Sequence, residues 1–374
     1  MIPFINVRAQ REAYKQEFLK AEQEVLDSGC YIGGPVVKAL EAELGKHTGA
    51  KHVITCGSGT DALTIALLAL GLEPGDEVIV PDFTFIAPAE CVMRLGGIPK
   101  FADIDRETLQ ISPESIEARI SEKTRGIIAV NLFGQCPNYK KIKEIAKKHG
   151  LWLIEDSAQA FGAMQCGQNA CTFGDISITS FYPAKPLGCY GDGGALFTHD
   201  DELAQKVRLI ANHGSNTRYV HEICGMNSRL DAIQAAVLRV KLKHLDDELK
   251  KRRENACKYN EFFAEFSDIN KATESTNCEK IAPQKIAEGN TSTYAQYTLL
   301  VENRDAFLKQ LESAQIPYCI HYPIPLHEQP CFRELVQCRE NKNAIAVSQK
   351  VVSLPMCAFT DVDAIVERLV GSRQ

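Results

Sequence analysis

Between residues 51 and 212, short apolar runs alternate with segments of helical spacing. The apolar runs are rich in β-branched residues, which favour strands. We expect strands over residues 51–55, 77–80, 99–102, 126–130, 151–154, 176–181 and 194–198, and helices over 61–68, 138–149 and 201–212. This alternation indicates βαβ units. It predicts an α/β fold whose mostly parallel sheet carries helices on both faces.

The pattern changes near Leu238. Residues 238–263 have the spacing of one long amphipathic helix, and their many charges are typical of a solvated helix face. After it we expect a polar loop over 268–290, a strand over 294–301, a helix over 305–314 and a strand over 317–321. The sequence therefore predicts a large domain over residues 1–245 and a smaller α+β domain over residues 246–374.

Composition and charge exclude several classes of protein. The chain has 374 residues, of which 45% are hydrophobic and 24% charged, the usual balance of a protein with a packed core. A net charge of −6 argues against binding to nucleic acid. No apolar run approaches the roughly 18 residues of a membrane span. The first ten residues also lack the apolar core of a signal peptide. We expect a cytoplasmic protein that does not bind a membrane.

The 14 cysteines raise the question of a metal site. No two of them are spaced C-x-x-C, and the closest pair, Cys166 and Cys171, has no histidine nearby. Structural zinc sites need ligands at short paired spacings. Scattered thiols in a reducing compartment mostly pack as small hydrophobic side chains. We therefore expect no metal.

A glycine turn, Cys56–Ala62, stands between an expected strand and an expected helix. The free amides at a helix N-terminus favour an anion, and Ser58 and Thr60 add hydroxyl donors. A turn with an ordinary helix cap explains the same residues. The pattern Gly57-x-Gly59-x-x-Ala62, with Asp82 20 residues later, also fits a dinucleotide fingerprint. From this turn alone, a cap, a phosphate monoester and a dinucleotide all remain open.

An acidic residue, Asp156, follows the apolar strand over 151–154. This position is the carboxyl end of a parallel strand, where open α/β sheets bind their ligands. A carboxylate there can keep a cofactor's ring nitrogen protonated, as an electron-sink cofactor requires. An aspartate that caps the following turn is the alternative.

A single lysine, Lys185, follows the strand over 176–181 and lies between Pro183 and Pro186. A glycine-rich stretch leads from this loop into the next strand. Most lysines are solvated surface charges, but a rigid loop suits a lysine that must form a Schiff base with a carbonyl. Together with an anion-binding turn and a strand-end aspartate, this lysine indicates pyridoxal 5′-phosphate (PLP) chemistry.

Two further groups are ambiguous from spacing alone. Asn227 and Arg229 precede a helix, so they can either reach an anion or cap the helix. Tyr318–His327 places aromatic residues and histidines in a proline-rich loop, and isolated histidines are usually structural.

These stretches together resemble the DegT/DnrJ-type sugar aminotransferases, which are PLP enzymes of fold type I, the aspartate aminotransferase fold. The resemblance runs from Pro3–Ile5 to Ser353–Pro355 and rests on five collinear motifs: Gly59–Leu63, Pro74–Val78, Glu155–Gln159, Ser180–Lys185 and Asn227–Arg229. The stretches Lys185–Gly194, Tyr294–Tyr297 and His321–Leu326 are similar to one branch. That branch aminates UDP-2-acetamido-2-deoxy-3-oxo-glucuronate for surface polysaccharides such as lipopolysaccharide.

The resemblance implies a role for each matching residue. It makes Lys185 the Schiff-base residue and proton shuttle, pairs Asp156 with the pyridinium nitrogen and places Gln159 near the ring and its 3-hydroxyl. It stacks Phe85 on the ring and assigns the phosphate to Ser58, Gly59, Thr60, Ser180 and, from a partner subunit, Asn227. It makes Arg229, His321 and Tyr322 substrate contacts, supplied by the other chain. The resemblance also implies a homodimer with its sites at the subunit interface. It implies L-glutamate as the amino donor and a UDP- or dTDP-linked keto sugar as the acceptor.

Three other functions compete with this one. A nicotinamide oxidoreductase has no use for Lys185 or Asp156. Related PLP-dependent sugar dehydratases carry histidine in place of the lysine, and a non-catalytic relative would typically have lost the lysine or the aspartate. Among aminotransferases, the alternative acceptor is a 3- or 4-keto-6-deoxy nucleotide sugar. The chain departs from the family pattern at Pro88, where Thr or Ser is usual.

Overall fold

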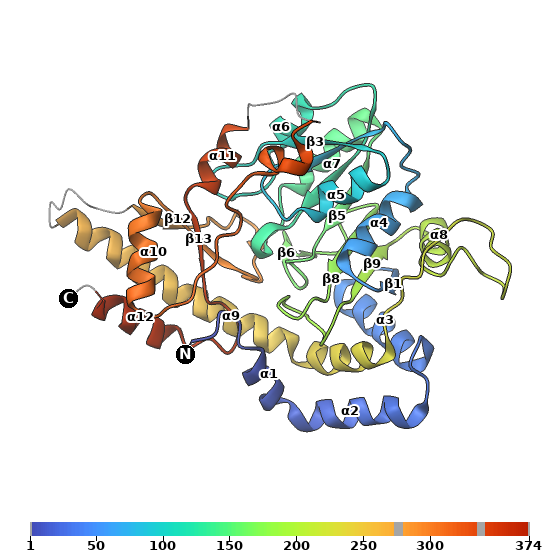
Figure 1. Ribbon diagram of the computed structural model, residues 1–374, viewed down its shortest axis with the longest axis horizontal. Coiled ribbons are helices and arrows are strands. Elements are labelled where there is room, and N and C mark those ends of the chain that lie inside the picture. The colour runs from blue at the N-terminus through green and yellow to red at the C-terminus, as the bar shows by residue number, and fades with distance from the viewer. Residues whose placement is uncertain (1, 273–279, 335–340, 373–374) are drawn as a thin grey trace.

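A seven-stranded sheet forms the centre of the computed structural model, which describes residues 2–272, 280–334 and 341–372 (Figure 1). The strand order is β1-β9-β8-β5-β4-β2-β3. The strands are β1 (His52–Cys56), β2 (Glu77–Pro81), β3 (Ile98–Ala102), β4 (Thr124–Val130), β5 (Trp152–Asp156), β8 (Ile176–Ser180) and β9 (Gly194–Thr198). Six of these strands run in the same direction, and β9 runs opposite to them. The predicted α/β fold with a mostly parallel sheet is confirmed.

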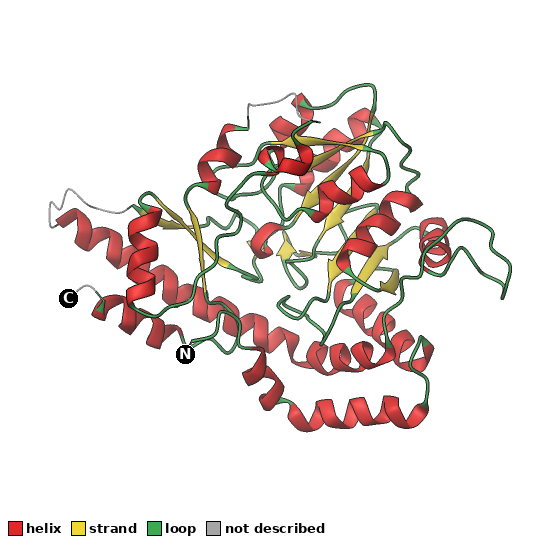
Figure 2. Cartoon of the chain, in the orientation of Figure 1, coloured by secondary structure: helices red, strands yellow, loops and turns green. Residues whose placement is uncertain are grey.

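Helices cover both faces of the sheet (Figure 2). On one face lie α4 (Gly59–Ala69), α5 (Ala87–Arg94) and α8 (Asp201–Ala211). The other face packs against α3 (Gly34–Thr48), α6 (Pro113–Ala118), α7 (Tyr139–His149) and the start of α9 (Ala232–Ala272). Since successive strand residues point to opposite faces, Val78 and Val80 of β2 join the first core and Ile79 joins the second.

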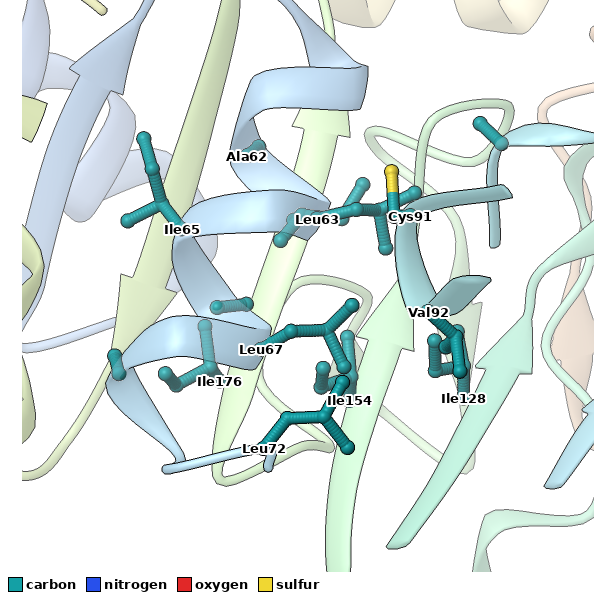
Figure 3. Close-up of a cluster of buried hydrophobic side chains, with 14 of the residues drawn as sticks. Ala62, Leu63, Ile65, Leu67, Leu72, Cys91, Val92, Ile128, Ile154 and Ile176 are labelled. Carbon is teal, nitrogen blue, oxygen red and sulfur yellow. The ribbon is translucent and has the colours of Figure 1, made fainter. Parts of the chain in front are cut away.

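The core on the α4 side explains why this region folds as it does. The α4 sequence is apolar almost all round, and Ala62, Leu63, Ile65 and Leu67 are all buried (Figure 3). They join one core with residues of the sheet; Leu63 and Leu67 point toward Cys91 and Val92 of α5, and Ile65 lies on the other side of α4. Pro88 lies in the first turn of α5. Proline is tolerated there because a backbone N–H at this position would have no acceptor within the helix.

Three N-terminal elements were not among the predicted ones: α1 (Val7–Ala13), α2 (Lys15–Ser28) and α3. The α2 helix packs along α9, as Figure 1 also shows. The α9 helix itself begins six residues before the predicted 238 and continues beyond the predicted 263, to Ala272. Its first turns are rich in buried alanine, which favours helix but carries little amphipathic signal.

The C-terminal part contains an antiparallel sheet of β10 (Ile281–Pro283), β12 (Tyr297–Val301) and β13 (Val351–Leu354). The last helices α10 (Arg304–Ser313) and α12 (Val362–Gly371) share a core with it, and α11 (Lys342–Ser348) precedes β13. A second small sheet joins β6 (Met164–Gln165), β7 (Gln168–Asn169) and β11 (Asn290–Thr291). Three short 3₁₀ turns, η1 (Leu132–Gly134), η2 (Leu326–Glu328) and η3 (Pro330–Phe332), complete the elements that are described.

Two predictions for this region were wrong. The segment 317–321 is not a strand, because only Cys319 pairs with Ser353 and the prolines at 317 and 323 limit further backbone pairing. The predicted loop over 268–290 contains the end of α9 and the strand β10, while its residues 273–279 lie outside the described ones. Across the described residues, no helix has the length and apolar character needed to span a membrane.

Candidate active site

One cavity of about 560 Å³ lies at the carboxyl edge of the parallel strands. Because these strands share a direction, the residues that follow β1, β2, β5 and β8 meet at the same edge of the sheet. Ten of the twelve predicted site residues line it: Ser58, Gly59, Thr60, Phe85, Asp156, Gln159, Ser180, Lys185, His321 and Tyr322. The chain thus brings together residues up to 264 positions apart.

The N-terminus of α4 forms one end of the cavity. Ser58 caps this helix, and its Oγ accepts a hydrogen bond from the Asp61 amide at 3.0 Å. The amides of Gly59 and Thr60 belong to the first turn, where no intrahelical acceptor is available. A Cβ on Gly59 would stand 2.7 Å from the Ser180 Cβ, so only glycine allows this close approach. The arrangement fits the phosphate group of PLP.

Asp156 is the last residue of β5, and its side chain is buried in the cavity wall. Burial raises the pKa of this carboxyl to about 6; the Ala158 amide, which donates to Oδ1 at 2.9 Å, and the charge of Lys185 oppose the rise. A buried carboxylate with a single described donor is incompletely satisfied. It fits a ligand that brings a positively charged N–H.

The neighbouring Glu155 points to the opposite side of β5, because strand side chains alternate. It is fully buried, and five donors from four segments bond its carboxylate: the side chains of Asn131, Ser157 and Ser177 and the amides of Cys171 and Phe173. This network fixes the end of β5, which in turn fixes the position of Asp156.

Lys185 lies in the loop that joins β8 to β9, and its amide donates to the Tyr182 carbonyl at 2.9 Å. Burial lowers the pKa of its ammonium, while the charge of Asp156 acts in the opposite direction. A lowered lysine pKa increases the fraction of neutral amine, which is the nucleophilic form.

An aromatic wall closes the other side. The Phe85 side chain is 53% exposed and lines the cavity, and its ring centroid lies 6.4 Å from that of Tyr322. The Tyr322 ring also stacks on Phe133, and its hydroxyl accepts from Gln159 Nε2 at 3.3 Å. Gln159 Oε1 in turn accepts a hydrogen bond from the Phe133 backbone amide at 2.9 Å. Both the oxygen and the nitrogen of the Gln159 side chain are therefore held in place.

His321 and Tyr322 line the same cavity as Lys185 of their own chain, which corrects the expectation that the other chain supplies them. The segment that carries them folds back over the sheet edge, where Phe83 and Phe133 pack against Tyr322. His321 Nδ1 lies 3.0 Å from Ser353 Oγ. Burial, with the charge of Lys185 adding to it, lowers the His321 pKa to about 4. His321 is therefore neutral at pH 7 and offers hydrogen bonds rather than a positive charge.

Asn227 and Arg229 are not brought into this cavity. Both are exposed, and Arg229 lines a separate cavity of about 750 Å³. They lie near the end of the segment between α8 and α9, part of which projects away from the rest of the chain (Figure 1).

Ten lining residues were not among the predicted site residues, and four of these are polar: Thr84, Tyr182, Asp192 and Gln296. Within the described part of the chain, the buried atoms Thr84 Oγ1 and Gln296 Oε1 have no hydrogen-bond partner. Such an atom costs about 1–3 kcal/mol unless a ligand satisfies it. Thr84 stands next to the predicted ring-stacking residue Phe85, but nothing in the sequence indicated that its hydroxyl lacks a partner.

The alternative reading of Asp82 as a ribose ligand finds no support. Asp82 is fully buried, it is not among the cavity residues, and its carboxylate is already bonded to His327 and Asn341. The described residues also contain no cluster of three or more His, Cys, Asp or Glu side chains that could hold a metal ion. Cys278 and Cys338 fall outside the described residues.

Comparison with known proteins identifies the family. The profile of the DegT/DnrJ/EryC1/StrS aminotransferase family matches residues 12–370. The chain belongs to this family. As a family member it is an aminotransferase of the PLP-dependent fold type I, as the motifs predicted.

Similar proteins span its whole length. A UDP-2-acetamido-2-deoxy-3-oxo-D-glucuronate aminotransferase from Pseudomonas aeruginosa is 42% identical over 98% of each chain. A dTDP-3-amino-3,6-dideoxy-alpha-D-galactopyranose transaminase from Aneurinibacillus thermoaerophilus is 37% identical over 99% of this chain and 98% of its own.

Solved structures agree with this assignment. A family aminotransferase from Brucella abortus has a TM-score of 0.92 and 38% identity over 99% of each chain. The Bacillus subtilis protein NtdA, solved with bound cofactor PMP, has a TM-score of 0.86 and 30% identity over 97% of this chain and 82% of its own.

Proposed function

We propose that this aminotransferase transfers the amino group of L-glutamate to the keto carbon of UDP-2-acetamido-2-deoxy-3-oxo-glucuronate, with PLP as cofactor. The observation that carries the proposal is the single cavity in which Lys185, Asp156 and the N-terminus of α4 converge. The similarity to the Pseudomonas aeruginosa enzyme supports the choice of acceptor. The similarity to the Aneurinibacillus thermoaerophilus enzyme supports the alternative, a 6-deoxy keto sugar linked to dTDP.

The cofactor supplies an electron sink that stabilises negative charge at the carbon next to the transferred nitrogen. The chain's own residues bind and orient it. The α4 amides and the Ser58 and Ser180 hydroxyls would hold the phosphate, Asp156 would keep the ring nitrogen protonated, and Phe85 would orient the ring. Lys185 Nζ would bind the cofactor covalently, and its amine would carry the proton that amino transfer must move.

Two residues complete the site from a second copy of the chain. Asn227 and Arg229 are exposed and lie outside the cavity of their own chain, so a partner subunit can present them. In a homodimer, Asn227 of the partner subunit reaches the phosphate and Arg229 of the partner subunit binds the acceptor.

The protein works in the cytoplasm in surface polysaccharide biosynthesis. Its cofactor domain spans residues 1–245 and its small domain residues 246–374, and α9 continues unbroken across this division.

The test is the visible absorption spectrum of the purified protein before and after L-glutamate is added. We expect a band from lysine-bound PLP that disappears with L-glutamate, and returns when the uronate acceptor is added. A return only with dTDP-linked 6-deoxy keto sugars would favour the alternative acceptor. A colourless protein that takes up no added PLP would refute the proposed function.

Arg229→Ala is expected to raise KM for the uronate far more than for a neutral keto sugar. A hydrogen bond to a charged group contributes about 1.5–3 kcal/mol, so the loss should be roughly 10-fold to 100-fold and confined to the charged substrate. Steady-state kinetics on both acceptors measures it, with Arg229→Lys as the control that keeps the charge. Equal losses on both acceptors would show that Arg229 does not recognise the carboxylate.

A further inference from the structure

A buried polar cluster of Asp82, His327 and Asn341 stands behind two walls of the candidate active site. Asp82 follows β2 and shortly precedes Thr84 and Phe85, which line one wall of the cavity. His327 lies in η2, five residues after Tyr322 of the other wall. Asp82 and Asn341 are fully buried, and His327 is 6% exposed. None of the three lines the cavity.

The contacts in this cluster are specific. Asp82 Oδ1 accepts from the His327 amide at 2.8 Å, and Oδ2 lies 2.5 Å from His327 Nδ1. Asn341 Nδ2 donates to Oδ2 at 2.9 Å, and the Asp82 carbonyl accepts from the Leu326 amide at 2.8 Å. The contacts therefore hold the backbone of η2 and the end of β2 together.

The cluster is also anchored to the sheet. Asn341 Nδ2 lies 3.2 Å from the Phe101 carbonyl of β3, and Asn341 Oδ1 accepts from Arg119 Nη2 at 3.0 Å. A buried carboxylate must keep its donors, since loss of one leaves charge unpaired in a low-dielectric interior. Separating the two walls would remove donors from the buried Asp82 carboxylate, so these three hydrogen bonds stabilise the packed arrangement of the walls.

The two walls touch through aromatic rings. The Tyr322 ring centroid lies 6.0 Å from Phe83 and 6.4 Å from Phe85. Phe85 lies three positions after Asp82, and Tyr322 lies five positions before His327. Such short connections transmit a displacement of the cluster directly to Phe85 and Tyr322.

We propose that Asp82, His327 and Asn341 form a clamp that positions Phe85 against Tyr322 and so sets the affinity of the cavity for its cofactor. The three are positioning residues, because they act through Phe85 and Tyr322 and touch no ligand. The inference rests on the proposed function for the identity of the ligand.

The first experiment compares His327→Leu with His327→Asn. The leucine variant removes the Nδ1 donor, whereas the asparagine side-chain amide places a donor in a similar position. Titration of cofactor-free protein with PLP should show a dissociation constant at least about tenfold higher for His327→Leu and within about twofold of wild type for His327→Asn. Asn255→Ala is the matched control, since Asn255 is a buried amide with two carbonyl partners, Cys357 and Thr360, in the small C-terminal part.

A merely structural role would predict a different result. Thermal unfolding of the cofactor-free variants reports general destabilisation, which His327→Leu and Asn255→Ala should share. Only His327→Leu should weaken PLP binding. Moreover, in a Phe85→Ala background the His327→Leu change should add little further loss, because both act through the same ring. Fully additive losses, or equal weakening by Asn255→Ala, would overturn the clamp.

Hydrogen exchange of the cofactor-free protein gives a readout that needs no ligand. In His327→Leu, amide exchange should rise about tenfold or more in peptides that cover 83–86 and 320–324, and Asn255→Ala should leave both unchanged. Unchanged exchange in His327→Leu would refute the clamp even if PLP binds. A wild-type protein that binds no PLP would refute the proposed function, while the exchange result would still decide the clamp.

Discussion

Lys185→Ala is expected to abolish amino transfer from L-glutamate, with a loss of at least about 10³-fold in the single-turnover rate. The reason is that one amine has two tasks: it attaches the cofactor, and it moves the proton that transamination must relocate. Proton transfer by a positioned group alone contributes about 10²–10⁴-fold. The variant should still retain PLP through gel filtration, since the α4 N-terminus, Ser180 and Asp156 remain in place.

Lys241→Met is the matched control for this experiment. Lys241 is buried, its pKa is lowered by burial to about 8, and its Nζ lies 4.8 Å from the centre of the Tyr190 ring. It does not line the cavity. We therefore expect Lys241, which has a lowered pKa but does not face the cavity, to be dispensable for amino transfer. Near-normal turnover in Lys185→Ala, or an equal loss in Lys241→Met, would overturn the catalytic assignment of Lys185.

The sequence predicted the centre of the site because each of its parts is locally encoded. Asp156 ends an apolar strand, and the turn around Ser58 joins a strand to an apolar helix. Lys185 follows a strand too. The parallel order of the strands is enough to place all three at one edge. No long-range information beyond the alternation of strands and helices was needed.

Other features depend on contacts between distant segments, which spacing does not encode. Asp82 matched a ribose-binding position, yet its carboxylate is bonded to residues 245 and 259 positions further along the chain. Gln296 became a candidate only because folding leaves its oxygen without a partner beside the cavity. His321 was assigned to the other chain, since sequence alone does not show which copy contributes a residue. The start of α9 was missed because buried alanines show little periodicity.

Asp156→Asn is expected to lower the rate of amino transfer by roughly 10²-fold or more and to remove one limb of the pH dependence of PLP binding. An ionised Asp156 can hold the proton on the cofactor's ring nitrogen, whereas a neutral amide cannot pair with that charge. Breaking a buried ion pair by removing one partner costs about 3–5 kcal/mol, which corresponds to this loss. Stopped-flow transfer from L-glutamate measures the rate, and titration of cofactor-free protein measures binding.

The sign of the pH effect follows from burial. Because burial raises the pKa of Asp156 to about 6, the folded protein holds this proton more tightly than the unfolded chain does. Above pH 6 the ionised, buried Asp156 therefore lowers the free energy of unfolding. A cationic ring nitrogen that pairs with this carboxylate would offset the loss. Below pH 6 the ligand must first displace the proton, so PLP affinity should rise with pH through about 6 and then level off. The rise of PLP affinity through about pH 6 should persist in Asp192→Asn, which alters another carboxylate of the same cavity. If the same rise persists in Asp156→Asn, the titrating group is not Asp156.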